Sequence, residues 1–175
     1  GHEKVLILDE PTSMLTPQGV AELGEVMRHL RDRGVALLFV THKLKEAYQL
    51  CDRVTVLRQG EVAGEVEVDN RDVDSEERVV NSVVQMMFDQ SAIGQRTGQR
   101  LAQAKQDNTS TNPDRNADES NVRLRASGLV TIAEPGECPL RSVSFEIIEG
   151  EIFGVAGIDG NGQKHLAEAI SGQRK

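Results

Sequence analysis

The chain has 175 residues, of which 38% are hydrophobic and only 3% aromatic, so it can bury one ordinary core, and that core must be aliphatic. Its formal net charge of -8 argues against a nucleic-acid-binding surface, because neutralising phosphates requires clustered Lys and Arg. The longest apolar run, residues 35–40, is far shorter than the roughly 20 residues that cross a bilayer, and no signal peptide is visible. We therefore expect that the chain does not enter a membrane by itself.

Two further features concern the setting of the chain. Cys51 and Cys138 are far apart and lack metal-ligand spacing, so we interpret them as reduced thiols of a cytoplasmic protein. The first residue is Gly1 rather than Met, and the first expected strand begins almost at once. The sequence therefore reads as a piece cut from a longer protein.

The first expected strand is the run of apolar residues 5–8 (VLIL), which ends in two carboxylates. The run is too short for a helix and rich in branched side chains, which suits a strand buried on both faces of a parallel sheet. Asp9 and Glu10 follow it, and Pro11 ends it because proline has no N–H for the ladder. Open α/β sheets bind ligands at this end of their strands, where one carboxylate can serve Mg²⁺ and the next can orient a water. The alternative is a solvated acidic turn.

The next segment predicts a crossover helix and a second buried strand. Thr16 and Pro17 suit the N-cap and the first helical position, and Gly34 supplies a C-terminal stop. Residues 35–40 (VALLFV) then complete a strand–helix–strand unit, whose right-handed crossover is nearly obligatory. His42 follows this strand, at the sheet edge where the acidic pair is expected. A lone histidine here could also be structural.

At this point the chain resembles the ATP-binding cassette (ABC) ATPases. Residues 8–12 (LDEPT) match their Walker B motif, and His42 matches their switch histidine. Residues 13–16 (SMLT) lie where their D-loop lies, but end in threonine where aspartate is usual, which puts communication between the two sites of the dimer in doubt. The resemblance implies that Asp9 holds Mg²⁺ through water, that Glu10 is the general base for the attacking water, and that His42 contacts the γ-phosphate of ATP.

The middle of the chain predicts small elements followed by a linker. Residues 43–50 read as a short helix, and residues 53–58 and 61–68 alternate apolar and polar side chains about a Gln-Gly turn, which predicts a hairpin with one wet face. A helix with acidic residues in its first turn is expected from Ser75, packed on the sheet. From about residue 90 to 121 polar residues dominate, so we expect a flexible linker.

Structure is expected to resume at residue 122, and residues 152–156 (IFGVA) predict a third buried strand. A glycine-rich loop and then a helical segment follow it. This is the context that a phosphate cradle needs, because glycine lets backbone N–H groups approach phosphate oxygens and the helix N-terminus adds positive potential. The candidate phosphate-binding residues are Gly157, Asp159, Gly160, Asn161, Gly162, Gln163 and Lys164.

The loop departs from the pattern G-x-x-x-x-G-K-[ST] at its end. Gln163 takes the lysine position and Lys164 the Ser/Thr position, and Lys164 is expected to point elsewhere. A charged hydrogen bond to phosphate contributes roughly 1.5 to 3 kcal/mol, so its loss should weaken nucleotide binding by about 10- to 150-fold. The missing hydroxyl removes a Mg²⁺ ligand. The segment near Val130 also lacks the aromatic residue on which ABC proteins stack adenine.

Degenerate loops of this form are familiar in the second cassette of tandem ATP-binding subunits of sugar and nucleoside importers, which the chain resembles from end to end. The resemblance implies that residues 1–89 are the C-terminal half of a first cassette, with Walker B, D-loop and H-loop. Residues 90–121 are then the linker, and residues 122–175 the N-terminal part of a second cassette with a degenerate Walker A loop. The implied fold class is α/β: pieces of a P-loop NTPase, with a parallel sheet core and a small antiparallel β part.

The resemblance also implies a function. The protein would bind and hydrolyse ATP with Mg²⁺, at the cytoplasmic face of the cell membrane, and couple hydrolysis to import of a sugar or nucleoside. Its partners would be membrane-spanning permease subunits, a solute-binding protein and the second cassette of the same chain, with no nucleic acid. No Ser-Gly-Gly signature segment occurs here, so we expect this chain alone to be inactive. The alternatives are a soluble tandem-cassette ATPase associated with ribosomes or DNA, and an inactive truncated remnant.

One hypothesis concerns strand order. By the resemblance, the phosphate-loop strand lies beside the strand that ends at the switch histidine, and without the first half of cassette one that strand is left with a bare edge, which invites pairing. Residues 152–156 are a strand of the right kind, and the linker is long enough to reach. The chain is then a circularly permuted mini-cassette in which residues 157–162 lie near Asp9.

Overall fold

The computed structural model of the chain describes residues 4–68, 75–88 and 121–174. Except for Asn121, the expected linker over residues 90–121 lies outside the described residues. The elements of the described part are, in chain order, β1 (Val5–Asp9), α1 (Pro17–Asp32), β2 (Ala36–Thr41), α2 (Leu44–Leu50), β3 (Arg53–Arg58), β4 (Glu61–Glu67), α3 (Ser75–Phe88), β5 (Val122–Leu129), β6 (Val143–Ile148), β7 (Ile152–Ala156) and α5 (Gln163–Ile170).

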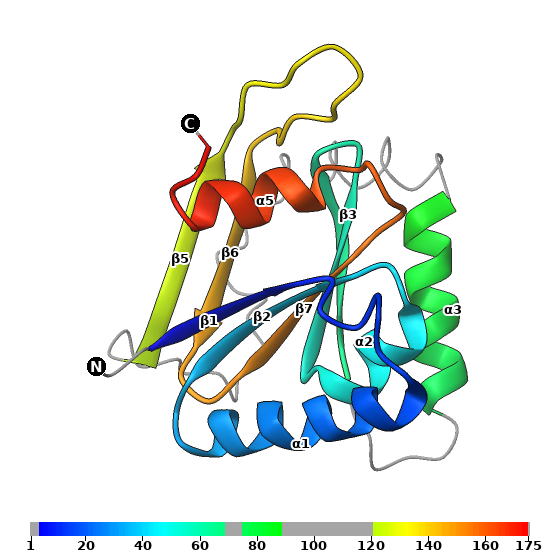
Figure 1. Cartoon of the computed structure of the whole chain (residues 1–175). Coiled ribbons are helices and arrows are strands. Elements are labelled where there is room, and N and C mark those ends of the chain that lie inside the picture. Colours follow the sequence, from blue (N-terminus) through cyan, green and yellow to red (C-terminus); the bar gives the residue numbers. More distant parts are fainter. Residues whose placement is uncertain (1–3, 69–74, 89–120, 175) are drawn as a thin grey trace, which may run out of the picture.

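The main sheet combines strands from both ends of the chain. Its order is β1-β2-β7-β3-β4, with β7 parallel to β2 on one side and to β3 on the other, and β4 antiparallel to β3. The pairing of β7 with β2 is the one that the hypothesis of a permuted mini-cassette requires, and it is confirmed (Figure 1). The α/β fold class is confirmed as well, because a separate antiparallel pair, β5 and β6, accompanies the mostly parallel sheet.

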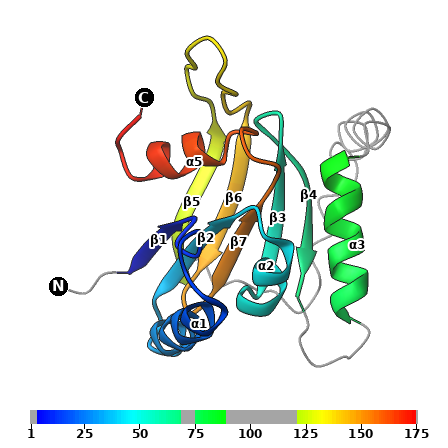
Figure 2. The ribbon, with the colours of Figure 1, turned by 45° about the vertical axis from the view of Figure 1, so that its right-hand side comes forward.

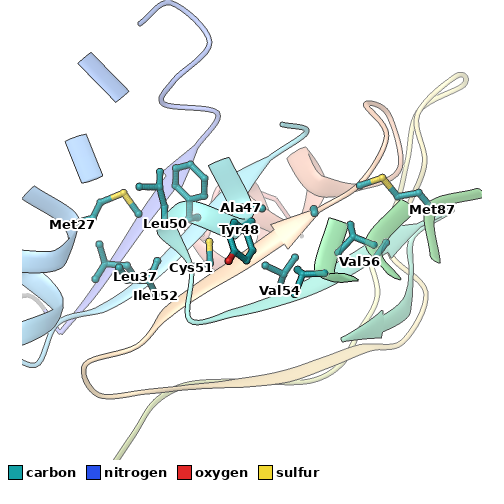
Figure 3. Packing of buried hydrophobic residues seen from close by; sticks show 14 residues of the cluster. Met27, Leu37, Ala47, Tyr48, Leu50, Cys51, Val54, Val56, Met87 and Ile152 are labelled. Carbon is teal, nitrogen blue, oxygen red and sulfur yellow. The ribbon is translucent and has the colours of Figure 1, made fainter. Parts of the chain in front are cut away.

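Alternate residues of the central strands face two different clusters of buried side chains. On β2, Leu37 and Phe39 pack in one cluster with residues of α1, α2 and α3, part of which is drawn in Figure 3. Ala36, Leu38 and Val40 pack in the other cluster, with residues of β6 and α5. Helices and the β5–β6 pair therefore cover both faces of the sheet (Figures 1 and 2), which explains why its central strands are continuous apolar runs.

The place of β7 between β2 and β3 depends on a close approach at Gly154. A Cβ atom added at this residue would lie 2.7 Å from the Sγ atom of Cys51. Cys51 is buried in the helix-side cluster, as Figure 3 illustrates. Any larger residue at position 154 would force the end of α2 away from the sheet.

The first crossover helix begins as its sequence predicts. The Thr16 hydroxyl oxygen accepts a hydrogen bond from the Gly19 N–H at 3.2 Å, and Pro17 occupies the first helical position. After the helix, Gly34 adopts a φ of 82°, in the left-handed region that glycine tolerates best. These signals set the length of α1 and hence the point at which β2 begins.

One expectation about the β3–β4 hairpin is wrong. The alternating pattern predicted a hairpin with one wet face; β3 and β4 do pair antiparallel, but every residue of β3 is buried, and only β4 keeps exposed positions. The reason is that β3 is an internal strand between β7 and β4, and side chains from its two faces belong to the two buried clusters. Arg53 is buried there because its guanidinium pairs with Glu65 and Glu151 and lies 4.5 Å above the centre of the Phe153 ring.

Among the residues that the structure describes, no helix combines the length and apolar character needed to cross a lipid bilayer.

Candidate phosphate-binding and catalytic site

The candidate residues lie at the carboxyl edge of the three adjacent strands β1, β2 and β7. Asp9 is the register partner of Val40, and Thr41 that of Ala156. The acidic pair, His42 and the glycine loop therefore follow three strands that end at the same level (Figure 1). This edge is where parallel α/β sheets bind ligands.

Glu10 and His42 contact each other directly. The Glu10 Oε1 atom lies 2.8 Å from the His42 Nδ1 atom, and both side chains are partly exposed. Since a carboxylate can only accept, the imidazole Nδ1–H donates, which leaves Nε2 for a ligand. Glu10 has a φ of 45°, a conformation that residues other than glycine rarely take and that often marks functional positions.

Asp9 lies in a negative environment. Partial burial raises its pKa, and the carboxylates of Glu10 and Glu168 raise it further, whereas the Lys164 ammonium lowers it. Glu168 and Lys164 belong to α5, so the helix after the glycine loop is close enough to β1 to act on Asp9. Lys164, which was expected to point elsewhere, is thus a cation within electrostatic reach of the acidic pair.

The turn after the acidic pair is held by residues that the sequence reasoning missed. The Thr12 hydroxyl donates a short hydrogen bond to the Glu46 carboxylate. The Lys43 Nζ atom donates to the Thr12 carbonyl at 2.9 Å and lies 3.1 Å from Glu46 Oε1. The only sequence signal was that Lys43 follows the candidate histidine. Met14, two residues after the Thr12 that these contacts hold, is 93% exposed.

The glycine loop leads from β7 directly into α5. Gly160 and Gly162 have φ values of 81° and 103°, so both positions need glycine. The Gln163 side chain folds back into the loop, where its Oε1 accepts from the Asn161 N–H at 3.1 Å and its Nε2 donates to the Ile158 carbonyl at 3.0 Å. The Lys164 side chain is 72% exposed, with its Nζ atom 3.8 Å from Glu168 Oε1.

A second polar cluster ties α5 to the loop between β5 and β6. The Thr131 hydroxyl accepts from the Leu140 N–H at 2.9 Å and lies 3.0 Å from Nδ1 of the buried His165. The His165 Nε2–H then donates to Glu137 at 3.1 Å. The Arg174 guanidinium also binds Glu137 and lowers its pKa to about 2. This cluster fixes the orientation of the helix that carries the candidate loop.

The donor set at the sheet edge suits Mg²⁺ only in part. Within the described ranges, no group of three or more His, Cys, Asp and Glu side chains could by itself hold a metal ion. Mg²⁺ is commonly bound by one or two carboxylates together with substrate phosphates. Asp9, a carboxylate at the end of β1 that is still open to solvent in part, fits that mode, whereas the Ser/Thr hydroxyl of a complete phosphate loop is replaced by Lys164.

Comparison with known proteins identifies relatives along nearly the whole chain. The chain is 33% identical to the ribose import ATP-binding protein RbsA of Chromobacterium violaceum, over 99% of this chain and 29% of that protein. It is 36% identical to the glucose import ATP-binding protein TsgD13 of Haloferax volcanii, over 97% of this chain and 27% of that protein. It is 31% identical to the galactose/methyl galactoside import ATP-binding protein MglA of Salmonella typhimurium, over 99% of this chain and 29% of that protein.

The chain thus spans less than a third of the length of these relatives. No family model matches it, and no solved structure does.

Proposed function

We propose that the chain is a segment of an ABC import ATP-binding protein, because it is similar along nearly its whole length to sugar import ATP-binding proteins, and that the longer protein hydrolyses ATP to drive solute import. The solute class that the relatives' names support is a sugar, with a nucleoside as the alternative from the glycine-loop pattern. The observation that carries the proposal is the 2.8 Å contact between Glu10 and His42 beside Asp9, at the carboxyl edge of a parallel sheet.

Each of the three residues has a distinct task in this proposal. Asp9 would hold Mg²⁺, and the ion would neutralise charge on the phosphates. Glu10 accepts the proton of the attacking water as general base. In its imidazolium form, His42 would hold the Glu10 carboxylate through Nδ1–H and donate Nε2–H to an oxygen of the terminal phosphate. The strained backbone at Glu10 supports a functional reason for this residue type.

We further propose how the chain divides within the longer protein. Residues 1–89 form part of a first cassette, residues 90–121 a linker, and residues 122–175 the start of a second cassette. Asp9, Glu10 and His42 then serve one ATP site, and the phosphate contacts of the loop from Gly157 to Lys164 belong to the other. As an isolated chain, the segment brings these half-sites to one sheet edge, but it contains no Ser-Gly-Gly signature segment, so we expect no useful hydrolysis.

The partners and the location follow from the same proposal. Permease subunits would span the membrane, a solute-binding protein would deliver the solute, and this protein would act at the cytoplasmic face. The acidic net charge of -8 favours this reading over a cassette protein that acts on ribosomes or DNA, since such a protein needs a basic surface.

The test compares Glu10→Gln with wild type in the full-length subunit, assembled with its membrane partners. Removing a general base costs about 10²- to 10⁴-fold in rate, so we expect a loss of ATP hydrolysis in that range. Glu22→Gln is the matched control, because Glu22 is exposed on α1, where it accepts a hydrogen bond from Gln18. Equal hydrolysis by wild type and Glu10→Gln would contradict the proposal.

A further inference from the structure

The glycine loop closes on one of its own side chains. Gln163 is buried, and its amide bridges the loop by accepting from the Asn161 N–H and donating to the Ile158 carbonyl. In a phosphate cradle, N–H groups of this kind must face the phosphate oxygens. In this chain, the Asn161 N–H already has two acceptors, the Gln163 amide oxygen at 3.1 Å and the Ile158 carbonyl at 3.2 Å.

The amide of Gln163 also fills the space at the start of the loop. A Cβ atom added at Gly157 would lie 2.4 Å from the Gln163 Nε2 atom and 2.5 Å from the Leu57 carbonyl oxygen. The amide nitrogen is therefore in close contact with the first glycine of the loop. The side chain that replaces lysine occupies the loop interior instead of extending away from it.

The loop is held in this form from outside as well. The Asn161 Oδ1 atom accepts from the Gln59 N–H at 2.8 Å, and the Asn161 carbonyl accepts from the Gly60 N–H at 3.0 Å. These donors belong to the tight turn between β3 and β4. Hydrogen bonds therefore hold Asn161 in place from two sides, from the hairpin turn and from the Gln163 side chain.

We propose that Gln163 is an internal occupant of the phosphate cradle, so that a nucleotide binds this loop only after the Gln163 amide has been displaced. The inference deepens the proposed function and rests on it, because it concerns the phosphate loop of the same family. Its consequence is specific. If glutamine were only a weak substitute for lysine, shortening it would reduce phosphate affinity further, whereas shortening an internal occupant increases affinity.

The experiment titrates the whole 175-residue chain with MgADP by calorimetry, for wild type, Gln163→Ala and Gln163→Ser. Neither short side chain can reach the Ile158 carbonyl, and serine keeps a polar residue at the first helical position. Displacing the wild-type amide costs two hydrogen bonds, so we expect both variants to bind MgADP about 10-fold tighter or more. Gln173→Ala, at an exposed glutamine beyond the same helix, should bind like wild type.

A second readout follows the loop without ligand. In both Gln163 variants, amide hydrogen exchange at Asn161 should accelerate because one of its two acceptors is lost and only the Ile158 carbonyl remains, while exchange in β7 stays slow. Unchanged or weaker MgADP binding by both variants, or no binding by any protein, would overturn the proposal. Such a failure is distinguishable from failure of the proposed function, since the Glu10→Gln comparison in the full-length protein does not involve this loop.

Discussion

Glu10 combines an unfavourable backbone conformation with a contact that chemistry needs. A φ of 45° costs an L residue roughly 1 to 2 kcal/mol, and this cost is removed when the residue is glycine. Glycine at this position would lack the Glu10 carboxylate, which contacts His42. The position is therefore one where the residue that suits activity differs from the residue that suits stability.

We predict that Glu10→Gly is more stable than Glu10→Ala. Both variants lose the contact with His42, so the difference in stability between them measures the cost of the backbone conformation at residue 10. The expected difference in the free energy of unfolding is about 1 kcal/mol in favour of glycine, measured by urea denaturation. Equal midpoints for the two variants would show that the left-handed conformation at this residue carries no strain.

The charge of Asp9 is predicted to lower stability at neutral pH. Its pKa is raised in the folded chain by burial and by Glu10 and Glu168, so the folded state binds the proton more tightly than the unfolded state does. Asp9→Asn should therefore be more stable than wild type at pH 7. The advantage should disappear below about pH 3.9, where Asp9 is protonated in both states.

Urea denaturation of both proteins from pH 3 to 8 measures this difference. Asp32→Asn is the matched control, because Asp32 is an exposed carboxylate at the end of α1 that pairs with Arg31, and it should not gain stability at neutral pH. An Asp9→Asn variant that is less stable than wild type at pH 7 would contradict the raised pKa.

At the scale of elements, β7 is held beside β3 by a buried ion pair as well as by apolar contacts. Arg53 of β3 donates to Glu151, just before β7, at 2.8 Å, and both side chains are almost fully buried. Arg53 also donates to the Glu146 carbonyl at 2.6 Å. Removing Glu151 leaves the buried Arg53 charge with Glu65, whose side chain is 41% exposed, in place of a buried partner.

We predict that Glu151→Leu destabilises the chain by about 3 to 5 kcal/mol. Arg53→Met combined with Glu151→Leu should recover part of that loss, because neither buried charge remains and Glu65, which loses Arg53, is partly exposed. The control is Glu146→Ala, which breaks an exposed pair with Arg125 and should cost less than about 1 kcal/mol. A double variant as unstable as the sum of its single variants would contradict the account.

Most helices and strands could be predicted from local sequence patterns, and the burial that was predicted wrongly has a physical cause. The strands at residues 5–9, 36–41 and 152–156 were visible as short apolar runs, and Thr16 and Pro17 marked the start of α1. The burial of β3 was not predictable, because alternation records which residues are polar but not that Arg53 finds buried acidic partners.

The candidate site was predictable to a similar extent. Motif spacing identified Asp9, Glu10 and His42 as candidate site residues, and in the structure Glu10 and His42 are in contact. The anchor of Thr12 on Glu46 and Lys43 depends on side chains that meet across the sheet edge. The folding of Gln163 into its own loop left no trace in the spacing, because a replaced lysine does not reveal where the new side chain points.

At the scale of the whole molecule, one parallel sheet is built from strands at the two ends of the chain. β7 lies between β2 and β3 although nearly a hundred residues separate β3 from β7 in sequence. Its residues are fully buried there, and its side chains belong to the clusters on both faces of the sheet. The two parts of the chain on either side of residues 89–120 therefore share one core and should unfold together.

The most direct test of this shared core is to cut the chain and ask whether its parts stay together. A specific protease site introduced between residues 95 and 115 is cleaved under native conditions, and the product is examined by size-exclusion chromatography and thermal unfolding. We predict that the two pieces elute together at the position of the uncut chain and unfold in one transition. Two pieces that separate without denaturant, each keeping its own folded structure, would contradict the single sheet.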